Sequence, residues 1–217
     1  MGRIAYLDCF SGISGDMLLG ALLDGGVPLD GMRAELARIP LAGYSLEAKR
    51  VTKGGLAAVQ AMVRVREAQH PRTLADIVSL IDKSSFPGAD CERATAVFRR
   101  LAEAEAAVHG ETVETVHLHD VGAVDAMVDV IGTIAGLRLL GVEELYCSPL
   151  PVGEGRVEGP HGALPVPAPA TLELLARAEA PLRASDADQG ELVTPTGAAI
   201  VTTLARFQRP EMTLERV

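Results

Sequence analysis

The residues RIAYLDCFSGISGDMLLGALLDGG, numbers 3–26, contain the first strand and the first helix that the sequence predicts. Segment 3–10 is short and mostly apolar, which indicates a buried strand. A turn of serine and glycine then leads into an apolar helix, and the pair Gly25 and Gly26 ends it. A strand that passes directly into a helix favours an architecture in which the two kinds of element alternate.

The rest of the chain continues this alternation. Segments 44–51 and 57–67 alternate apolar and polar residues on either side of a glycine-containing turn, which predicts an antiparallel hairpin. Extended segments are expected at 115–119 and 144–153, and helices at 73–82, 90–108, from 120 onward, 169–178 and 195–207. We therefore expect one α/β domain, residues 1–217, with a mixed sheet that includes an antiparallel hairpin and is covered by helices.

The composition argues against several classes of protein. A net charge of −9 in 217 residues disfavours non-specific binding to nucleic acid or to anionic membranes, because both need a basic face. The most apolar run, 130–142, is too short to span a membrane and contains Arg138. The three cysteines, Cys9, Cys91 and Cys147, are scattered and do not resemble a disulfide framework. Since the N-terminus has no signal pattern, we expect a protein of the reducing cytoplasm.

A pair of histidines precedes the long apolar helix in VHLHDVGAVDAMVDVIG, residues 116–132. In an extended segment His117 and His119 point the same way, a spacing that suits two imidazole ligands on one metal ion. The alternative is a pair that hydrogen-bonds only with backbone carbonyls. Asp120 follows and is a favourable residue to cap the helix.

Two acids are set into that apolar helix. Asp125 and Asp129 are one turn apart and share a face with Gly122, Gly132 and Gly136, within an arc of roughly 80°. Because glycines let another backbone or a ligand approach closely, this stripe predicts a narrow, acidic, partly buried crevice. The alternative is a stripe that faces solvent, although exposed stripes usually carry longer polar residues.

A further acid and histidine lie on the preceding helix. Glu105 borders its apolar face, and His109 follows one turn later on the same side. Such a pair can orient the imidazole or share a metal ion with it. The simpler interpretation is a positive charge near the C-terminus of a helix.

Two turns are candidates to bind phosphate. Ser11, Gly12, Ser14 and Gly15 lead from a strand into a helix, where free backbone N–H groups can point at an anion. Asp16 lies in the first turn of that helix, where the helix dipole alone would favour an acid.

The second turn lies near the end of the chain. Thr194, Thr196 and Gly197 open a helix and offer hydroxyl and amide groups together, although an ordinary helix cap explains them equally well. His161 lies between glycines in a loop rich in glycine and proline, a kind of loop that often lines a cleft.

Five segments, from the first strand to the last helix, match the motifs of one family in order. They resemble the LarC family, the nickel insertion proteins for pyridinium-3,5-bisthiocarboxylic acid mononucleotide. The matching segments are YLDCFSGISGDM (6–17), AEAEAAVHG (102–110), VHLHDVGAVDAMVDVIG (116–132), PVGEGRVEGPHGALPVPAPAT (151–171) and GELVTPTGAAI (190–200).

This resemblance implies a cytoplasmic, CTP-dependent cyclometallase of the lyase class. Such an enzyme attaches nickel to the pyridinium mononucleotide through two sulfurs and one ring carbon, which gives the nickel-pincer cofactor of lactate racemase. Family members continue into a C-terminal domain that binds CTP with Mg or Mn, so the resemblance makes residues 1–217 the N-terminal domain. Many relatives also carry a histidine-rich stretch before the helix that begins near Thr73, whereas this chain has only His70 there.

The resemblance also implies roles for the candidate residues and for partners. With this family in view, we expect nickel at His117, His119, His109 and Glu105, with Asp125 or Asp129 as alternative carboxylate ligands. Catalysis would involve Asp125, Asp129 and Asp16, and the group that accepts the ring proton is left open. The substrate phosphate would bind at one of the two turns, Ser11, Gly12, Ser14 and Gly15 or Thr194, Thr196 and Gly197, and His161 would also contact the substrate. The expected partners are the small-molecule mononucleotide and the C-terminal domain; a homo-oligomer is left open, and neither nucleic acid nor membrane is expected.

Two other functions remain open from the sequence. One is a nickel carrier or scaffold that performs no chemistry itself. The other is a metal-dependent phosphohydrolase that uses Asp8 and Asp16 together with the Asp125 and Asp129 pair.

Overall fold

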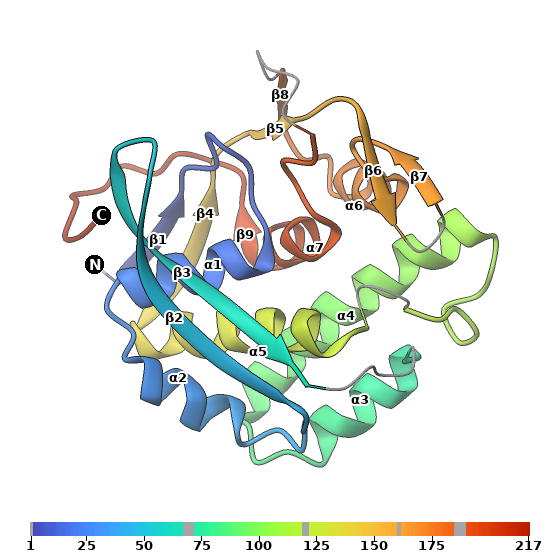
Figure 1. Cartoon of the computed structure of the whole chain (residues 1–217), viewed down its shortest axis with the longest axis horizontal. Helices are drawn as coiled ribbons and strands as arrows, with labels where there is room; N and C mark the ends of the chain where they lie inside the picture. The colour runs from blue at the N-terminus through green and yellow to red at the C-terminus, as the bar shows by residue number, and fades with distance from the viewer. Residues whose placement is uncertain (1, 67–71, 119–121, 160–161, 185–189) are drawn as a thin grey trace.

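The computed structural model describes residues 2–66, 72–118, 122–159, 162–184 and 190–217 (Figure 1). Three parallel strands form the central sheet in the order β1 (Arg3–Leu7), β4 (Val142–Cys147) and β9 (Ala205–Arg206). Leu7 at the end of β1 pairs with Cys147 at the end of β4. The C-terminal ends of these two strands therefore lie side by side, at the start of the first serine and glycine turn.

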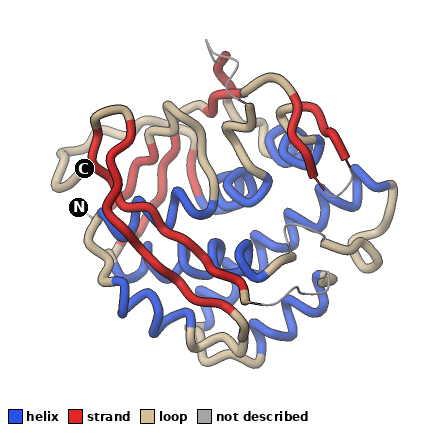
Figure 2. The backbone as a smooth tube through the Cα atoms, in the orientation of Figure 1, coloured by secondary structure: helices blue, strands red, loops and turns tan. Residues whose placement is uncertain are grey.

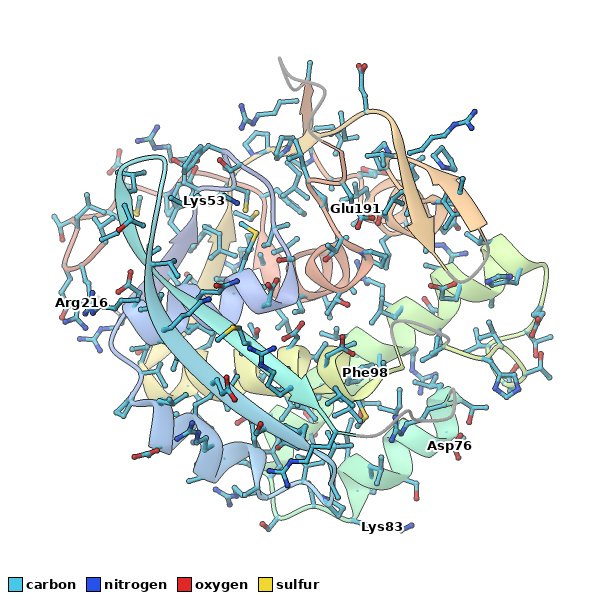
Figure 3. The ribbon with its side chains drawn as sticks, in the orientation of Figure 1. Lys53, Asp76, Lys83, Phe98, Glu191 and Arg216 are labelled. Carbon is cyan, nitrogen blue, oxygen red and sulfur yellow. The ribbon has the colours of Figure 1, made fainter. Side chains whose placement is uncertain are left out.

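Helices supply most of the core. They are α1 (Gly15–Asp24), α2 (Leu29–Leu36), α3 (Leu74–Asp82), α4 (Gly88–His109), α5 (Val124–Leu139), α6 (Pro169–Arg177) and α7 (Pro195–Leu204). Helices α5 and α7 pack against β4 and β9 of this sheet. Helix α5 packs against α1, α2, α4 and α7, and Phe98 on α4 is fully buried inside the molecule (Figure 3). Among the described residues, no helix is long and apolar enough to cross a membrane.

The predicted hairpin forms from β2 (Tyr44–Lys53) and β3 (Leu56–Val65), which pair antiparallel along their whole length. It lies across α1 and α5, apart from the shorter parallel strands, and makes a sheet of its own (Figure 2). Helix α1 touches β3 closely at Gly20, where a Cβ atom would stand 2.5 Å from the carbonyl oxygen of Val59. An α/β fold with parallel and antiparallel strands is thus confirmed, with the two kinds of pairing in separate sheets.

Two pairs of short strands complete the fold: β5 (Leu150–Val152) with β8 (Leu182–Ala184), and β6 (Arg156–Gly159) with β7 (Gly162–Pro165). The single strand expected at 144–153 is wrong, since β4 ends at Cys147 and β5 begins at Leu150. Pro149 lies between them, and proline cannot donate to a strand ladder. In segment 115–119, the described part makes one antiparallel bridge, from Leu118 to Arg72.

Local signals for helix ends are confirmed at several positions. Thr73 and Asp76 form a reciprocal capping box at the start of α3. Gly110 ends α4 in the left-handed conformation, with φ at 67°, which glycine adopts at little cost. Helices α6 and α7 both have proline in the first turn, as predicted.

The N-terminus and the glycine stripe of α5 differ from prediction. The helix begins at Val124 with Ala123 as its N-cap, so Asp120, outside the described residues, is not the cap. A Cβ atom at Gly132 would lie 2.7 Å from Leu19 Cδ2, so that glycine admits a neighbouring helix and not a ligand. Gly136 likewise packs against α1 and α2. The predicted crevice is therefore wrong along this half of α5, where α1 and α2 fill it.

An ion-pair cluster ties three helices together on the far half of α5. Arg138 Nε donates to Asp90 Oδ2 on α4 at 2.5 Å, and its Nη2 donates to Glu35 Oε2 on α2 at the same distance. Asp90 is only 2% exposed. A carboxylate this deeply buried needs a charged partner, and Arg138 supplies it.

Candidate functional site

The two turns predicted to bind phosphate lie against each other. The backbone N–H of Ile13 donates to the carbonyl of Leu192 at 2.8 Å, and that of Thr194 donates to the carbonyl of Ile13 at 3.1 Å. Ile13 and Val193 thereby form a parallel bridge. These bonds hold the N-termini of α1 and α7 side by side, although the two turns are far apart in the sequence.

Glycine is required for this close approach. Gly12 has φ at +98°, and a Cβ atom on it would stand 2.0 Å from the carbonyl oxygen of Leu192. A Cβ atom on Gly197 would stand 2.6 Å from the carbonyl oxygen of Ile13. Any larger residue at either position would push the two helix ends apart.

The hydroxyl groups of both turns act as helix caps. Ser14 Oγ accepts from the N–H of Met17 at 3.4 Å, and Asp16 Oδ1 accepts from the same N–H at 2.9 Å. Ser14 also donates to the Asp16 carboxylate. Thr194 Oγ1 accepts from the N–H of Gly197 at 3.2 Å. The simpler interpretation, an ordinary cap, is therefore confirmed for Thr194, and Ser14 caps α1 in the same way.

A third helix N-terminus meets the other two. Asp129, in the second turn of α5, packs against Gly15 so closely that a Cβ atom there would stand 2.3 Å from Asp129 Oδ2. Asp125, one turn earlier, accepts from the N–H of Ala126 at 2.9 Å. Three helix N-termini and three carboxylates, those of Asp16, Asp125 and Asp129, thus converge.

These elements surround an open pocket of about 420 Å³. One wall is the turn before α1 and the first residues of that helix, and another is the N-terminus of α7. The start of α5 and strand β3 supply the remaining walls. The lining residues are Ser14, Gly15, Asp16, Gln60, Ala61, Met62, Val63, Arg64, Asp125, Asp129, Thr194 and Thr196.

Asp129 is the most perturbed carboxyl group of this pocket. Burial first, and then the nearby charges of Asp16 and Asp125, together raise its pKa from 3.8 to about 8. Its Oδ1 atom is buried and has no hydrogen-bond partner among the described residues. At neutral pH the group is therefore mostly a neutral acid, in contact with a pocket that opens to solvent.

The wall formed by β3 was not foreseen from the sequence. Gln60, Met62 and Arg64 alternate along this strand, and Arg64 brings a positive charge to the pocket. Arg64 Nε lies 3.5 Å from Glu47 Oε2 in an exposed ion pair, which competes only weakly for the guanidinium. The alternating pattern predicted the strand, but no local signal showed which helix ends it would face.

The described residues that were predicted to hold nickel lie outside the pocket. His109 Nε2 is 3.4 Å from Glu105 Oε2 at the end of α4, so these two do pair. His117 is exposed between buried Val116 and Leu118, and His119 is outside the described residues. Neither His109, Glu105 nor His117 lines the pocket.

His117 lies close enough to Asp76 on α3 to influence the pKa of that carboxyl group. The pKa of Asp76 lies below its usual value, first because the backbone and hydroxyl of Thr73 donate to it, then through the charges of Arg72 and His117. In the part of the chain that the structure describes, no three His, Cys, Asp or Glu side chains are grouped to hold a metal ion.

Only some of the residues predicted to contact the substrate line the pocket. Ser14, Gly15, Thr194 and Thr196 line it, whereas Gly12 and Gly197 make the close contacts between the two turns. Ser11 and Asp8 are exposed and do not line it, and His161 lies outside the described residues. The geometry therefore gives no support to a phosphohydrolase centred on Asp8.

The fold is α/β, and its open pocket lies where the N-termini of α1, α5 and α7 meet. The family of nickel insertion proteins matches residues 5–217 of the chain. This chain therefore belongs to the nickel insertion protein family. No solved structure matches it.

The names of similar proteins agree with this family assignment. The pyridinium-3,5-bisthiocarboxylic acid mononucleotide nickel insertion protein of Desulfitobacterium hafniense (strain DCB-2) is 48% identical over 217 residues, which cover 99% of this chain and 53% of that protein. A relative from Thermomicrobium roseum named for nickel insertion is 56% identical over 216 residues, 99% of this chain and 53% of its own length. Another, from Roseiflexus castenholzii, is 53% identical over 214 residues, 99% of this chain and 54% of its own. The chain spans about half the length of these relatives.

Proposed function

We propose that the pocket binds a pyridinium-3,5-bisthiocarboxylic acid mononucleotide and that nickel is attached to the ring there. The observation that carries the proposal is the joining of helix N-termini and carboxylates in one pocket. A pyridinium mononucleotide carries an anionic phosphate and a cationic ring. Helix N-termini attract the first, and carboxylates attract the second.

The phosphate would lie at the paired starts of α1 and α7. Gly15, Asp16 and Thr196 line the pocket there, and the phosphate would accept from their backbone N–H groups and from the Thr196 hydroxyl. The N–H groups of Met17 and Gly197 are already used by the caps. Arg64 on the opposite wall would add a charge-assisted bond to an anionic oxygen or sulfur of the substrate. This arrangement would orient the ring toward α5.

Asp129 is the group we assign to accept the ring proton when the carbon–nickel bond forms. A general base works best when its pKa lies near the working pH, and the pKa of Asp129 is about 8. The cationic ring would favour the ionised carboxylate and so lower this pKa on binding. Asp16 and Asp125, which are more exposed, would balance the charge of the ring and of the incoming metal ion.

Nickel enters this scheme as a substrate. The two sulfurs and the ring carbon of the mononucleotide supply three of its bonds, so the protein does not need a preformed metal cage. The Glu105 and His109 pair, with His117 and His119, stays our proposal for the place where nickel is first captured.

The remaining steps would involve more than the residues described above. We propose that the complete protein uses CTP with Mg or Mn, through a C-terminal domain, and that its product is the nickel-pincer cofactor of lactate racemase. On this basis the protein is a lyase-type cyclometallase of the cytoplasm.

Calorimetry tests the substrate site directly. The chain is titrated with the pyridinium mononucleotide and then with nickel, alone and in the preloaded complex. We expect the mononucleotide to bind, and Thr196→Val to weaken it about tenfold through one lost hydrogen bond. Thr52→Val, on an exposed part of the hairpin, is the matched control and should bind normally.

The same titrations separate the enzyme from a nickel carrier. A catalytic site should take up nickel more tightly once the mononucleotide is bound, because the ligand sulfurs contribute. Equal nickel affinity with and without the mononucleotide would favour the carrier. No binding of the mononucleotide at all would refute the proposed site.

A further inference from the structure

Two cysteines that are far apart in the sequence lie next to each other at the start of the turn that leads into α1. Cys9 follows β1 and Cys147 ends β4, and these neighbouring parallel strands bring their sulfur atoms to 3.6 Å. Cys9 is 5% exposed and Cys147 is fully buried. The third cysteine, Cys91, lies on α4 beside Ser84 and the carbonyl of Phe86, away from this pair.

The backbone around Cys9 connects the pair to the pocket. The N–H of Cys9 donates to Ser148 Oγ at 2.9 Å, and its carbonyl accepts from the N–H of Gly12 at 3.1 Å. Gly12 is the residue whose close contact with Leu192 joins the two helix ends. The thiol pair is therefore fixed in place by the same hydrogen bonds that shape the loop before α1.

We propose that Cys9 and Cys147 form a dithiol site that a peroxide converts to an intrachain disulfide. The sulfur atoms need to approach by only about 1.5 Å to reach the length of a disulfide bond. Cys9 lies just after β1, and Cys147 is the last residue of the adjacent strand β4. A small shift of the loop at Cys9 is therefore enough to bring the two sulfurs to bonding distance. The proposal does not depend on the function assigned to the pocket.

The two sulfurs differ in their chemistry. The hydrogen bond with Cys147 lowers the pKa of Cys9, and Ser148 and Arg183 act in the same direction against burial and Asp8. The same interaction, together with burial, raises the pKa of Cys147. Cys9 is also the more accessible sulfur, because its residue is 5% exposed whereas Cys147 is fully buried. We therefore assign Cys9 as the thiolate that attacks and Cys147 as the thiol that resolves.

The reaction balances with peroxide as the oxidant. The Cys9 thiolate attacks one oxygen of hydrogen peroxide, the O–O bond breaks, and Cys9 becomes a sulfenic acid with release of hydroxide. The sulfur of Cys147 then attacks the sulfur of Cys9, gives up its proton and displaces the sulfenic oxygen as water. In sum, two thiols lose two electrons and two protons, and one peroxide becomes two waters.

Mass spectrometry of the full chain tests the proposal. The reduced protein is treated with hydrogen peroxide, remaining thiols are alkylated, and the intact mass and the peptides are measured. We expect one alkylated cysteine, Cys91, and a peptide pair joined through Cys9 and Cys147 with a mass about 2 Da below the sum of the reduced peptides. Three alkylated cysteines after the treatment, or a bond that involves Cys91, would overturn the proposal.

Variants test the order of attack. In Cys147→Ser, a sulfenic acid should accumulate at Cys9 and react with dimedone. In Cys9→Ser, no dimedone adduct should form at Cys147, and Cys91→Ser, the matched control, should form the crosslink as the unchanged chain does. Adduct at Cys147 in Cys9→Ser, with none at Cys9 in Cys147→Ser, would contradict the assignment of Cys9 as the attacking thiolate.

Discussion

Asp90 and Asp129 are both carboxylates withdrawn from solvent on helices of the same core, but their surroundings differ. Asp90 receives a 2.5 Å bond from Arg138, which also bonds Glu35. Asp129 faces two other acids, and its Oδ1 atom has no partner among the described residues. The first carboxylate is bonded to a charged partner. The second is held neutral by its surroundings, and that difference separates a structural charge from one available to a ligand.

Removing Arg138, the partner of Asp90, should change the free energy of unfolding more than any other substitution below. Arg138→Met keeps much of the side-chain volume but removes the cation that Asp90 and Glu35 share, so that Asp90 keeps only Arg93 at 3.9 Å and Glu35 keeps Arg38 at 3.3 Å. We expect the free energy of unfolding to fall by about 3 to 5 kcal/mol, as is usual when one member of a buried pair is removed. Urea denaturation measures this change.

Arg177→Met is the matched control for that experiment. Arg177 pairs with Glu173 at a half-exposed position on α6, where an ion pair contributes about 0.5 kcal/mol or less. If the free energy of unfolding falls by a similar amount in both variants, the burial of Asp90 is not the reason for the effect of Arg138→Met.

Replacing Asp129, the second carboxylate, should raise the free energy of unfolding, whereas replacing Arg138 should lower it. Because burial and two neighbouring acids raise the pKa of Asp129 from 3.8 to about 8, the unfolded chain releases this proton at lower pH than the folded chain does. The stability that the bound proton contributes is full below about pH 4 and is lost as pH rises toward 8.

Asp129→Asn mimics the protonated acid and should therefore stabilise the chain. At pH 7 we expect a gain of about 2 to 4 kcal/mol and a flatter dependence of stability on pH between 4 and 8. Denaturation at several pH values measures both. Asp125→Asn, one turn away and exposed, is the control, and equal gains in the two variants would show that burial of Asp129 is not the cause.

The contact between α1 and Asp129 predicts a smaller effect. In Gly15→Ala the new Cβ atom would meet the Asp129 carboxylate at 2.3 Å, so α1 and α5 must shift. We expect a loss of about 1 to 3 kcal/mol, typical of overpacking. Gly88→Ala meets nothing within 4 Å and should be neutral or slightly stabilising. Thermal unfolding that shows no difference between the two variants would contradict this packing.

Features with local causes were predictable from the sequence. The hairpin, the capping box of Thr73 and Asp76 and the end of α4 at Gly110 each follow from a few adjacent residues. The two serine, threonine and glycine turns were also recognised as candidates. The stretch around Asp125 and Asp129 was singled out as well, because acids in an apolar helix need an explanation, and both residues line the pocket.

Features that depend on distant partners were not predictable. The face of α5 that carries Gly132 resembles a crevice on a helical projection, and only the position of Leu19 shows that it is filled. Arg64 in the pocket and the contact of Cys9 with Cys147 depend equally on tertiary packing. Periodicity identifies which residues share a face, but it does not identify what that face meets.

A pH titration of the Asp129 side-chain carboxyl carbon, followed by NMR, shows whether this acid is neutral in the free pocket and ionises when the cationic ring binds. We expect a pKa of about 8 in the free chain and a lower value with the pyridinium mononucleotide bound. A pKa near 3.8 in the free chain, or one that the ligand leaves unchanged, would contradict this expectation.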